Sequence, residues 1–137
     1  MMQIKLNNIQ FTEIDYKVDT FEKEISSEMK TSLKFNTVFI PENDKEYILE
    51  FYLSLKNPNP SFYLNLKVCA HFSTTEAMND EFKNSSFLDI NSPAIVFPYI
   101  RAFISNLTLN SGYNPIVLPM FNFVKIAEDK SKKVLKK

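Results

Sequence analysis

The residue types that most often perform catalysis or bind metals are scarce in this chain. The single cysteine, Cys69, and the single histidine, His71, are two positions apart, a spacing that puts them on one face of a strand about 7 Å from each other. That separation is too long for a hydrogen bond between a nucleophile and its base. Two such side chains also fall short of the ligand set of a structural zinc site. We therefore expect neither a catalytic dyad nor a metal site.

The carboxylates and the single glycine also argue against catalysis and cofactor binding. The adjacent carboxylates Asp80–Glu81 and Glu128–Asp129 lie in polar stretches, which favours solvated surface groups over an acid–base pair with a raised pKa. The only glycine, Gly112, excludes the glycine-rich loops that cradle phosphates and dinucleotides. The sequence thus predicts a protein that is not an enzyme and needs no cofactor.

The composition predicts one folded domain over residues 1–137. This length suits a single domain, and 45% hydrophobic residues with 13 Phe and 6 Tyr supply a real core. Residues 1–8 alternate apolar and polar types and lack the apolar centre of a signal peptide. Because an unpaired cysteine is typical of a reducing compartment, we expect the protein in the cytoplasm.

The charges are distributed unevenly along the chain. Lysines and arginines equal acidic residues at 16 each, but five lysines crowd residues 130–137, so residues 1–129 carry 11 basic and 16 acidic residues, a net charge of −5. An acidic body argues against nucleic-acid binding. The basic tail is either a solvated end or a tether to an acidic partner. Residues 102–124 carry no charge, but prolines and asparagines interrupt them, so we expect no membrane span.

Alternation of apolar and polar residues predicts strands in the first half of the chain. Four segments follow this pattern: residues 4–18, 29–39, 47–55 and 62–72. The last two are separated by residues 57–61, which contain two prolines, and are predicted to form an antiparallel hairpin. The first contains a break typical of a bulge. The charged residues 19–27 are compatible with either a loop or a helical turn.

After this half of the chain the apolar period becomes that of a helix. Ser92 is a suitable N-cap and Pro93 suits the first helical position. Apolar residues then recur at helical spacing as far as Leu107, and Gly112 is suited to the position just past a helix end. These signals predict a long helix over residues 92–111.

The rest of the chain is predicted to be a loop and a second helix. Residues 113–120, called the proline loop below, contain two prolines, and Asn122 is a suitable cap for a last helix over residues 122–135. Strands followed by helices indicate an α+β domain in which helix covers one face of the sheet.

Aromatic residues occur on both faces of the predicted hairpin. Tyr47, Phe51 and Phe62 share one face, whereas Tyr52 and Tyr63 lie on the other. A sheet that is apolar on both faces is either covered twice or used for binding. The pattern is compatible with a self-assembly interface, a ligand site, or both.

One segment carries a specific family resemblance. Residues 91–101 read NSPAIVFPYIR and resemble the PxILFPYAR stretch of the SecB family of protein-export chaperones. Residues 110–113, NSGY, are similar to the family's RGGF helix end, and residues 115–123, PIVLPMFNF, are similar to its PPLNLAPVNF stretch. Three linked blocks make coincidence improbable. Upstream, residues 4–16 and 47–72 resemble the family's first and central strands more weakly.

The resemblance implies a four-stranded antiparallel sheet with the long helix packed on one face, assembled as a dimer of dimers, that is, a homo-tetramer. Family members hold extended, non-native polypeptides in apolar grooves without ATP and deliver them to SecA. Matching positions assign seven client-binding residues: Leu33, Phe35, Phe62, Ile116, Leu118, Phe123 and Ile126.

The same matching assigns one contact to SecA. Glu13 stands where the family has a SecA-binding carboxylate, but Lys17 and Asn65 stand where it has two others. The resemblance therefore predicts a holdase for secretory precursors. The departures leave open a SecB-like chaperone dedicated to the antitoxin of a toxin–antitoxin system, and the aromatics leave open a scaffold protein that binds no client.

Overall fold

The computed structural model describes residues 2–25 and 29–135, with side chains as far as residue 129. The strands are β1 (Ile4–Val18), β2 (Lys30–Ile40), β3 (Asn43–Pro58) and β4 (Ser61–Thr74). The helices are α1 (Asp80–Lys83), α2 (Phe87–Asn110) and α3 (Phe123–Leu135).

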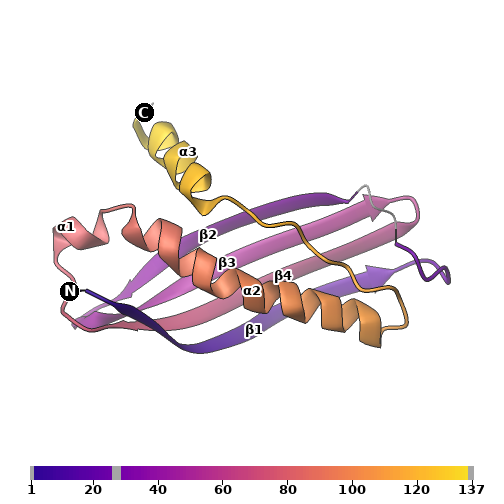
Figure 1. Cartoon of the computed structure of the whole chain (residues 1–137), viewed down its shortest axis with the longest axis horizontal. Helices are drawn as coiled ribbons and strands as arrows, with labels where there is room; N and C mark the ends of the chain where they lie inside the picture. The colour runs from indigo at the N-terminus through magenta and orange to yellow at the C-terminus, as the bar shows by residue number, and fades with distance from the viewer. Residues whose placement is uncertain (1, 26–28, 136–137) are drawn as a thin grey trace.

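The four strands form one antiparallel sheet in the order β1-β4-β3-β2. The long helix α2 lies across one face of this sheet, and the chain then returns beside α2 towards α3 (Figure 1). The predicted break in the first strand is present as register shifts between Leu6 and Asn8 and between Phe11 and Glu13. The structure thus confirms the predicted α+β fold with a four-stranded antiparallel sheet.

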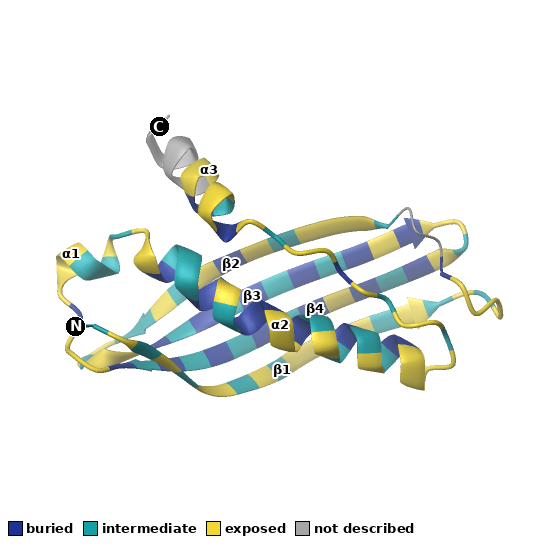
Figure 2. Ribbon diagram, viewed as in Figure 1, coloured by how far each residue is buried: buried dark blue, intermediate teal, exposed yellow. Residues whose placement is uncertain are grey.

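The apolar residues that alternate along the predicted strands form the core of the protein. Alternate residues of β3 and β4 point towards α2, which appears as alternating bands of burial along both strands (Figure 2). Their counterparts on α2 recur at helical spacing, and both sets are at most 3% exposed: Tyr47, Leu49, Phe51, Leu53, Leu55, Phe62, Leu64, Leu66, Val68, Ala70, Phe72, Val96, Phe97, Ile100 and Ile104. This packing explains why both patterns predicted their elements correctly.

The predicted start of the long helix is wrong. The helix begins at Phe87, with Ser86 as its N-cap residue, so Pro93 lies inside it. Ser92 is fully buried, and its Oγ lies 2.8 Å from the hydroxyl of Tyr47 on β3. Leu88 is also buried, at 2% exposure. Contact with the sheet therefore extends the helix over residues that resemble a cap in sequence.

Both predicted cap positions at the other helix ends are confirmed. Ser111 is the C-cap residue of α2, and Gly112 follows it with φ of 99°, the left-handed conformation that glycine adopts most readily. At the start of α3, Oδ1 of Asn122 accepts a hydrogen bond from the backbone N–H of Lys125, 3.1 Å away.

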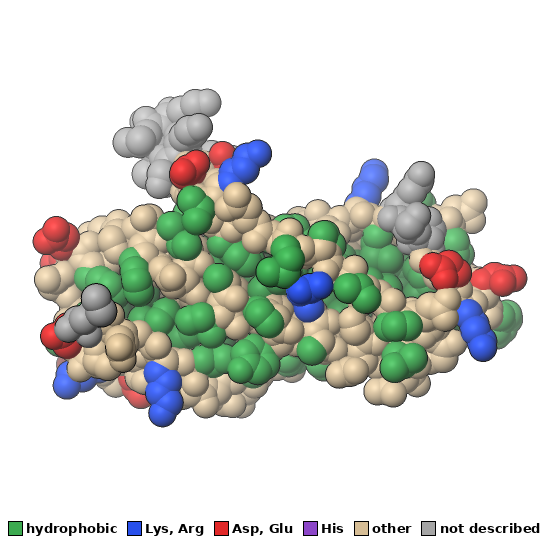
Figure 3. Space-filling view, in the orientation of Figure 1, with side chains coloured by type: hydrophobic (Ala, Val, Ile, Leu, Met, Phe, Trp, Pro, Cys, Tyr) green, Lys and Arg blue, Asp and Glu red, His purple; other side chains and the backbone are tan. Residues whose placement is uncertain are grey.

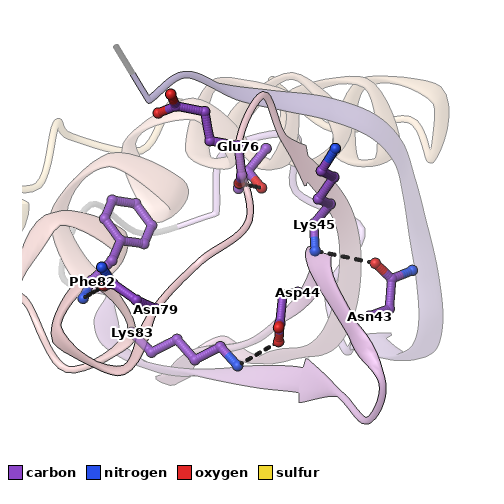
Figure 4. A network of polar contacts seen from close by, with 8 residues as sticks. Asn43, Asp44, Lys45, Glu76, Asn79, Phe82 and Lys83 are labelled. Carbon is purple, nitrogen blue, oxygen red and sulfur yellow. Dashed lines mark hydrogen bonds and ion pairs between the residues drawn. The ribbon is translucent and has the colours of Figure 1, made fainter.

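A short helix, α1, was not predicted. Asn79 caps it by accepting a hydrogen bond from the N–H of Phe82 at 2.8 Å. Nζ of Lys83 lies 3.0 Å from Oδ1 of Asp44 (Figure 4). The Asp44 carbonyl also accepts a hydrogen bond from the N–H of Met78 at 2.8 Å. These contacts hold the connection between β4 and α2 against the start of β3.

The segment between β1 and β2 is a loop as far as the structure describes it. Residues 19–25 contain no helix, and the N–H of Asp19 donates to the carbonyl of Ser61 at 2.9 Å. This excludes the helical turn for those residues, whereas residues 26 and 27 lie outside the described part of the chain.

The uncharged residues 102–124 do not form one continuous helix. They are divided among the end of α2, the proline loop and the start of α3. Among residues 2–25 and 29–135, no helix combines the length and the hydropathy needed to cross a bilayer.

Candidate functional site

The proline loop is held beside α2 by hydrogen bonds from its own backbone. The N–H of Ile116 donates to Oγ1 of Thr108 at 3.0 Å, and the Ile116 carbonyl accepts from Oγ of Ser105 at 2.7 Å. Thr108 is fully buried. Since the backbone of the loop is fixed in this way, its apolar side chains do not all have to pack inwards.

The start of the proline loop is tied to the loop between β1 and β2. The Tyr113 hydroxyl donates to the carbonyl of Thr20 at 2.6 Å, and the N–H of Asn114 donates to the carbonyl of Lys23 at 2.9 Å. Nδ2 of Asn114 also donates to Oε2 of Glu24 at 2.6 Å. Two segments about ninety positions apart in sequence therefore meet at one end of the sheet.

A cavity lies between these two segments and the start of β2. Its volume is about 410 Å³, within the range of about 300–1,000 Å³ that is typical of ligand pockets. We call it the loop cavity; its lining residues are Glu24, Ile25, Met29, Thr31, Asn114, Pro115, Ile116, Val117, Leu118 and Pro119. The wall is mainly apolar, with one carboxylate, so it suits the side chains of an apolar segment rather than a reaction.

An aromatic cluster closes the space between β2, α2 and the start of α3. The Phe97 ring of α2 lies 6.4 Å from Phe51, 5.0 Å from Phe121 and 5.8 Å from Phe123, between ring centroids. Phe35 of β2 lies 5.8 Å from Phe51 and 6.1 Å from Phe123. Such pairs contribute roughly 0.5–1.5 kcal/mol each beyond burial, so they fix the start of α3 on the sheet.

Four of the seven predicted client-binding residues are buried in the single chain. The exposed fraction is 5% for Phe35, 2% for Phe62, 3% for Leu118 and 7% for Phe123. The other three, Leu33, Ile116 and Ile126, are half-buried and pack against the core. The space between sheet and helix is thus largely filled by the protein's own side chains among the described residues.

Phe62 is separate from the other predicted client-binding residues. It lies at the start of β4, opposite Val18 of β1, with its ring 6.1 Å from that of Tyr16. The cavity that it lines contains Lys30 and Lys56 and none of the proline loop. The remaining six are on β2, the proline loop and α3. Of these, Phe35 contacts Phe123, and Ile116 and Leu118 line the loop cavity.

Three exposed apolar residues of the proline loop and the start of α3 were missed from the sequence. Val117 is 69% exposed, Met120 is 72% exposed and Val124 is 49% exposed. We call these three the exposed apolar track; hydrophobic side chains are spread over this face of the molecule (Figure 3). Nη1 of Arg101 lies 3.0 Å from Sδ of Met120. All three lie in the uncharged, proline-containing stretch of residues 102–124.

The sheet face opposite α2, called the outer face below, carries the predicted SecA contact. Glu13 pairs in register with Lys67, Lys17 with Tyr63, and Asn65 with Asp15. All of these side chains share the outer face, because they alternate with the buried positions.

Charges on the outer face interact with one another. Nζ of Lys67 lies 3.7 Å from Oε2 of Glu50 and 5.7 Å from the centre of the Tyr52 ring. The nearby Tyr52, followed by Glu50, holds the pKa of Lys67 above its usual value. The lysine therefore remains a cation at neutral pH.

Cys69 and His71 are half-buried on the same outer face. Sγ of Cys69 lies 4.0 Å from Oγ1 of Thr12. Within the part of the chain that the structure describes, His, Cys, Asp and Glu side chains form no group of three that could hold a metal ion. The loop cavity and the exposed apolar track are surfaces suited to the recognition of apolar groups.

These features define a class of protein in which a four-stranded antiparallel sheet carries one long helix and an apolar, proline-rich loop beside it. Residues 3–133 match the family model described as preprotein translocase subunit SecB. The chain belongs to the SecB family, as the sequence resemblance predicted.

Relatives with similar sequences match parts of the chain. An uncharacterized protein of Methanocaldococcus jannaschii, MJ0357, is 42% identical over 60 residues, 44% of this chain and 37% of the relative. A protein-export protein SecB of Anaplasma marginale is 31% identical over 64 residues, 47% of this chain and 36% of the relative. The matched parts thus span less than half the length of these curated relatives.

A solved structure confirms the fold. The Mycobacterium tuberculosis SecB-like chaperone Rv1957, in complex with a ChAD peptide from the HigA1 antitoxin, matches with a TM-score of 0.68. The match covers 86% of this chain and 87% of that chain at 13% sequence identity.

Proposed function

We propose that this protein is a holdase chaperone that binds unfolded polypeptide segments without ATP and acts in the cytoplasm. The observation that carries the proposal is the exposed apolar track beside the loop cavity. Burying one Leu or Phe of a client there yields roughly 1.5–3 kcal/mol, much of which is offset by ordering of the client. Each contact is therefore weak and unselective, as suits binding of many sequences.

Membership of the SecB family supports this role, because its family description and several relatives name protein export. The solved structure of the M. tuberculosis chaperone contains a bound peptide from an antitoxin, which supports peptide binding by the shared fold. The apolar cavity and the exposed apolar side chains support the proposal without reference to the family or to the solved structure.

Delivery of secretory precursors to SecA is the pathway that we propose first, on the basis of Glu13. A chaperone dedicated to one antitoxin is the second candidate, favoured by Lys17 and Asn65 on the outer face and by the antitoxin peptide in the solved relative. Binding of the purified protein to SecA and to a candidate antitoxin, measured by calorimetry, separates the two. Binding to SecA alone supports export, and binding to the antitoxin alone supports the second candidate.

We propose further that the protein assembles as a homo-tetramer, in which copies cover the outward side of α2. Tyr99 is 54% exposed and Leu109 is 55% exposed on this helix, and Arg101 is the only charged residue between Asp89 and Lys125. Several copies also raise the avidity of weak client contacts by about 10²–10⁴-fold. Light scattering measures the assembly; a monomer at all concentrations would contradict this part of the proposal.

The central experiment compares two substitutions on different surfaces. The double variant Val117→Glu/Met120→Glu places charges on the exposed apolar track, and the control Val38→Glu places one on a 37%-exposed residue of β2. Suppression of aggregation of a chemically unfolded client should fall strongly in the double variant and remain near wild type in the control.

The scaffold alternative gives the opposite results. A protein whose apolar residues serve only its own assembly would not suppress client aggregation, and a dye for apolar surfaces would bind little to the assembled wild type. Absence of both signals would overturn the holdase proposal.

A further inference from the structure

Three lysines form a row across the outer face at the end of the sheet where β3 turns into β4. Lys17 of β1 and Lys56 of β3 both pair in register with Tyr63 of β4, and Lys30 of β2 pairs with Lys56. All three lysines are exposed. Because neighbouring strands are about 4.8 Å apart, the three ammonium groups stem from backbone positions within about 15 Å of one another. We call them the lysine row.

This arrangement is electrostatically unfavourable without a partner. Lys30 and Lys56 stand directly opposite each other, and like charges in opposed positions of a sheet destabilise it. Lysines often protect the edges of sheets from pairing with other chains, which accounts for Lys17 and Lys30 on the edge strands β1 and β2. It does not account for Lys56, because β3 is a central strand.

A cavity adjoins two members of the lysine row. It has a volume of about 410 Å³, and its lining residues are Lys30, Lys56, Asn57, Pro58, Ser61, Phe62 and Tyr63. Two lysines, a serine and a tyrosine therefore line one cavity together with the apolar residues Pro58 and Phe62. Lysine donates hydrogen bonds and accepts none, so the matching ligand brings acceptors with negative charge.

The surrounding charges set the row apart from the rest of the molecule. Residues 1–129 carry a net charge of −5, whereas this row contains no carboxylate. The next row on the outer face consists of Asp15, Asn65, Ser54 and Ser32. Its single carboxylate, Asp15, lies on β1 next to Lys17 and three strands away from Lys30.

We propose that the lysine row binds an acidic peptide segment of a partner protein. Carboxylates spaced along such a segment reach the lysines in turn, and the cavity at Lys30 and Lys56 receives one acidic side chain. This docking site lies on the sheet face opposite the exposed apolar track, so it does not depend on the proposed client binding. The family resemblance implies a docking surface with carboxylates such as Glu13, whereas the lysine row favours an acidic partner.

The test measures binding of a labelled Glu-Ser repeat decapeptide to the full chain by fluorescence anisotropy, with a Gln-Ser decapeptide as the uncharged control. The wild type should bind only the Glu-containing peptide, and binding should weaken at about 0.3 M salt because exposed ion pairs are screened. The variant Lys30→Gln/Lys56→Gln should bind about fivefold more weakly or worse.

A matched control removes two lysines from the other end of the sheet. The variant Lys5→Gln/Lys45→Gln has the same net charge as the first, and its affinity should stay within about twofold of wild type. Lys56→Glu, which places a carboxylate opposite Lys30, keeps a favourable pair in the sheet and should also weaken binding. Equal losses in the two double variants would overturn the proposal, because they would indicate a response to net charge alone.

Other anionic partners are outcomes of the same assay. Vesicles containing phosphatidylglycerol present phosphates instead of carboxylates, and so does a duplex RNA. If either bound with the same dependence on Lys30 and Lys56 while the acidic peptide did not, the proposed partner would be wrong. Suppression of client aggregation should be unchanged in Lys30→Gln/Lys56→Gln, which separates failure of this site from failure of the holdase proposal.

Discussion

The core between the sheet and α2 and the exposed apolar track contain similar side chains in very different environments. Phe97 is 1% exposed on the inner side of α2, whereas Met120 is 72% exposed in the loop beside the same helix. Strands and helix bury one another because both present regular apolar faces, whereas the proline loop lies at the side of α2, fixed through its backbone at Ile116. In the proposed function, stability and client binding therefore depend on different surfaces.

The largest effect on stability is expected for Phe97→Ala. Phe97 contacts rings on β3, in the segment before α3 and in α3 itself, so its removal leaves a cavity where three elements meet. We expect a loss of about 3–5 kcal/mol in the free energy of unfolding, measured by denaturant titration. The control, Phe21→Ala, removes a fully exposed phenylalanine from the loop between β1 and β2. An equal loss there would contradict the division between surfaces.

A smaller loss is expected for Tyr47→Phe. This change removes the hydroxyl that meets Oγ of Ser92 at 2.8 Å and leaves a buried polar group without that partner, which costs about 1–3 kcal/mol. The unfolding free energy of the variant, compared with wild type at neutral pH, measures it. An unchanged free energy of unfolding would indicate that Ser92 forms another hydrogen bond in the variant.

The same tyrosine predicts a dependence on alkaline pH. Burial, opposed by the Ser92 hydrogen bond, raises the pKa of Tyr47 from 10.0 to about 12. Above pH 10 the unfolded chain loses this proton first, so the contribution of the tyrosine to stability is constant below pH 10 and declines between pH 10 and 12, by at most about 1.4 kcal/mol per pH unit. The wild type should lose stability faster than Tyr47→Phe in that window, and parallel curves would contradict the assignment.

Thr108→Val tests how the proline loop is held. The substitution keeps the shape of the side chain but removes the acceptor for the N–H of Ile116, at a cost of about 1–2 kcal/mol. Hydrogen exchange of the Ile116 amide should accelerate more than that of amides in β3 and β4. Equal acceleration everywhere would show that the loop and the core unfold together.

The smallest effect on stability is expected for Val117→Glu/Met120→Glu. Both side chains are more than two-thirds exposed, so the unfolding free energy should change by less than about 1 kcal/mol even where client binding is lost. A loss as large as that of Phe97→Ala would mean that the track belongs to the core.

Sequence patterns predicted the strands more successfully than the start of the helix. The alternation in residues 47–55 and 62–72 became β3 and β4 because each second residue faces α2. The start of α2 was misplaced because Ser92 and Pro93 are local start signals, whereas the contact of Ser92 with Tyr47 of β3 is a long-range interaction. Local signals identify helix ends only where no tertiary contact overrides them.

The candidate site was predictable in part. The family resemblance assigned Ile116 and Leu118 to client binding, and both residues line the loop cavity. Which side chains stay accessible could not be predicted from the sequence. Leu118 and Met120 are both apolar residues of one loop, yet Leu118 is 3% exposed and Met120 is 72% exposed.

The amino-acid order alone determined the fold class, the positions of the strands, the end of α2 at Gly112 and membership of the SecB family, because these depend on periodicity and on local motifs. Only the tertiary structure decided which apolar residues are left open and that Lys17, Lys30 and Lys56 stand in one row. Both depend on strand register and on loop packing, which bring together residues far apart in the chain.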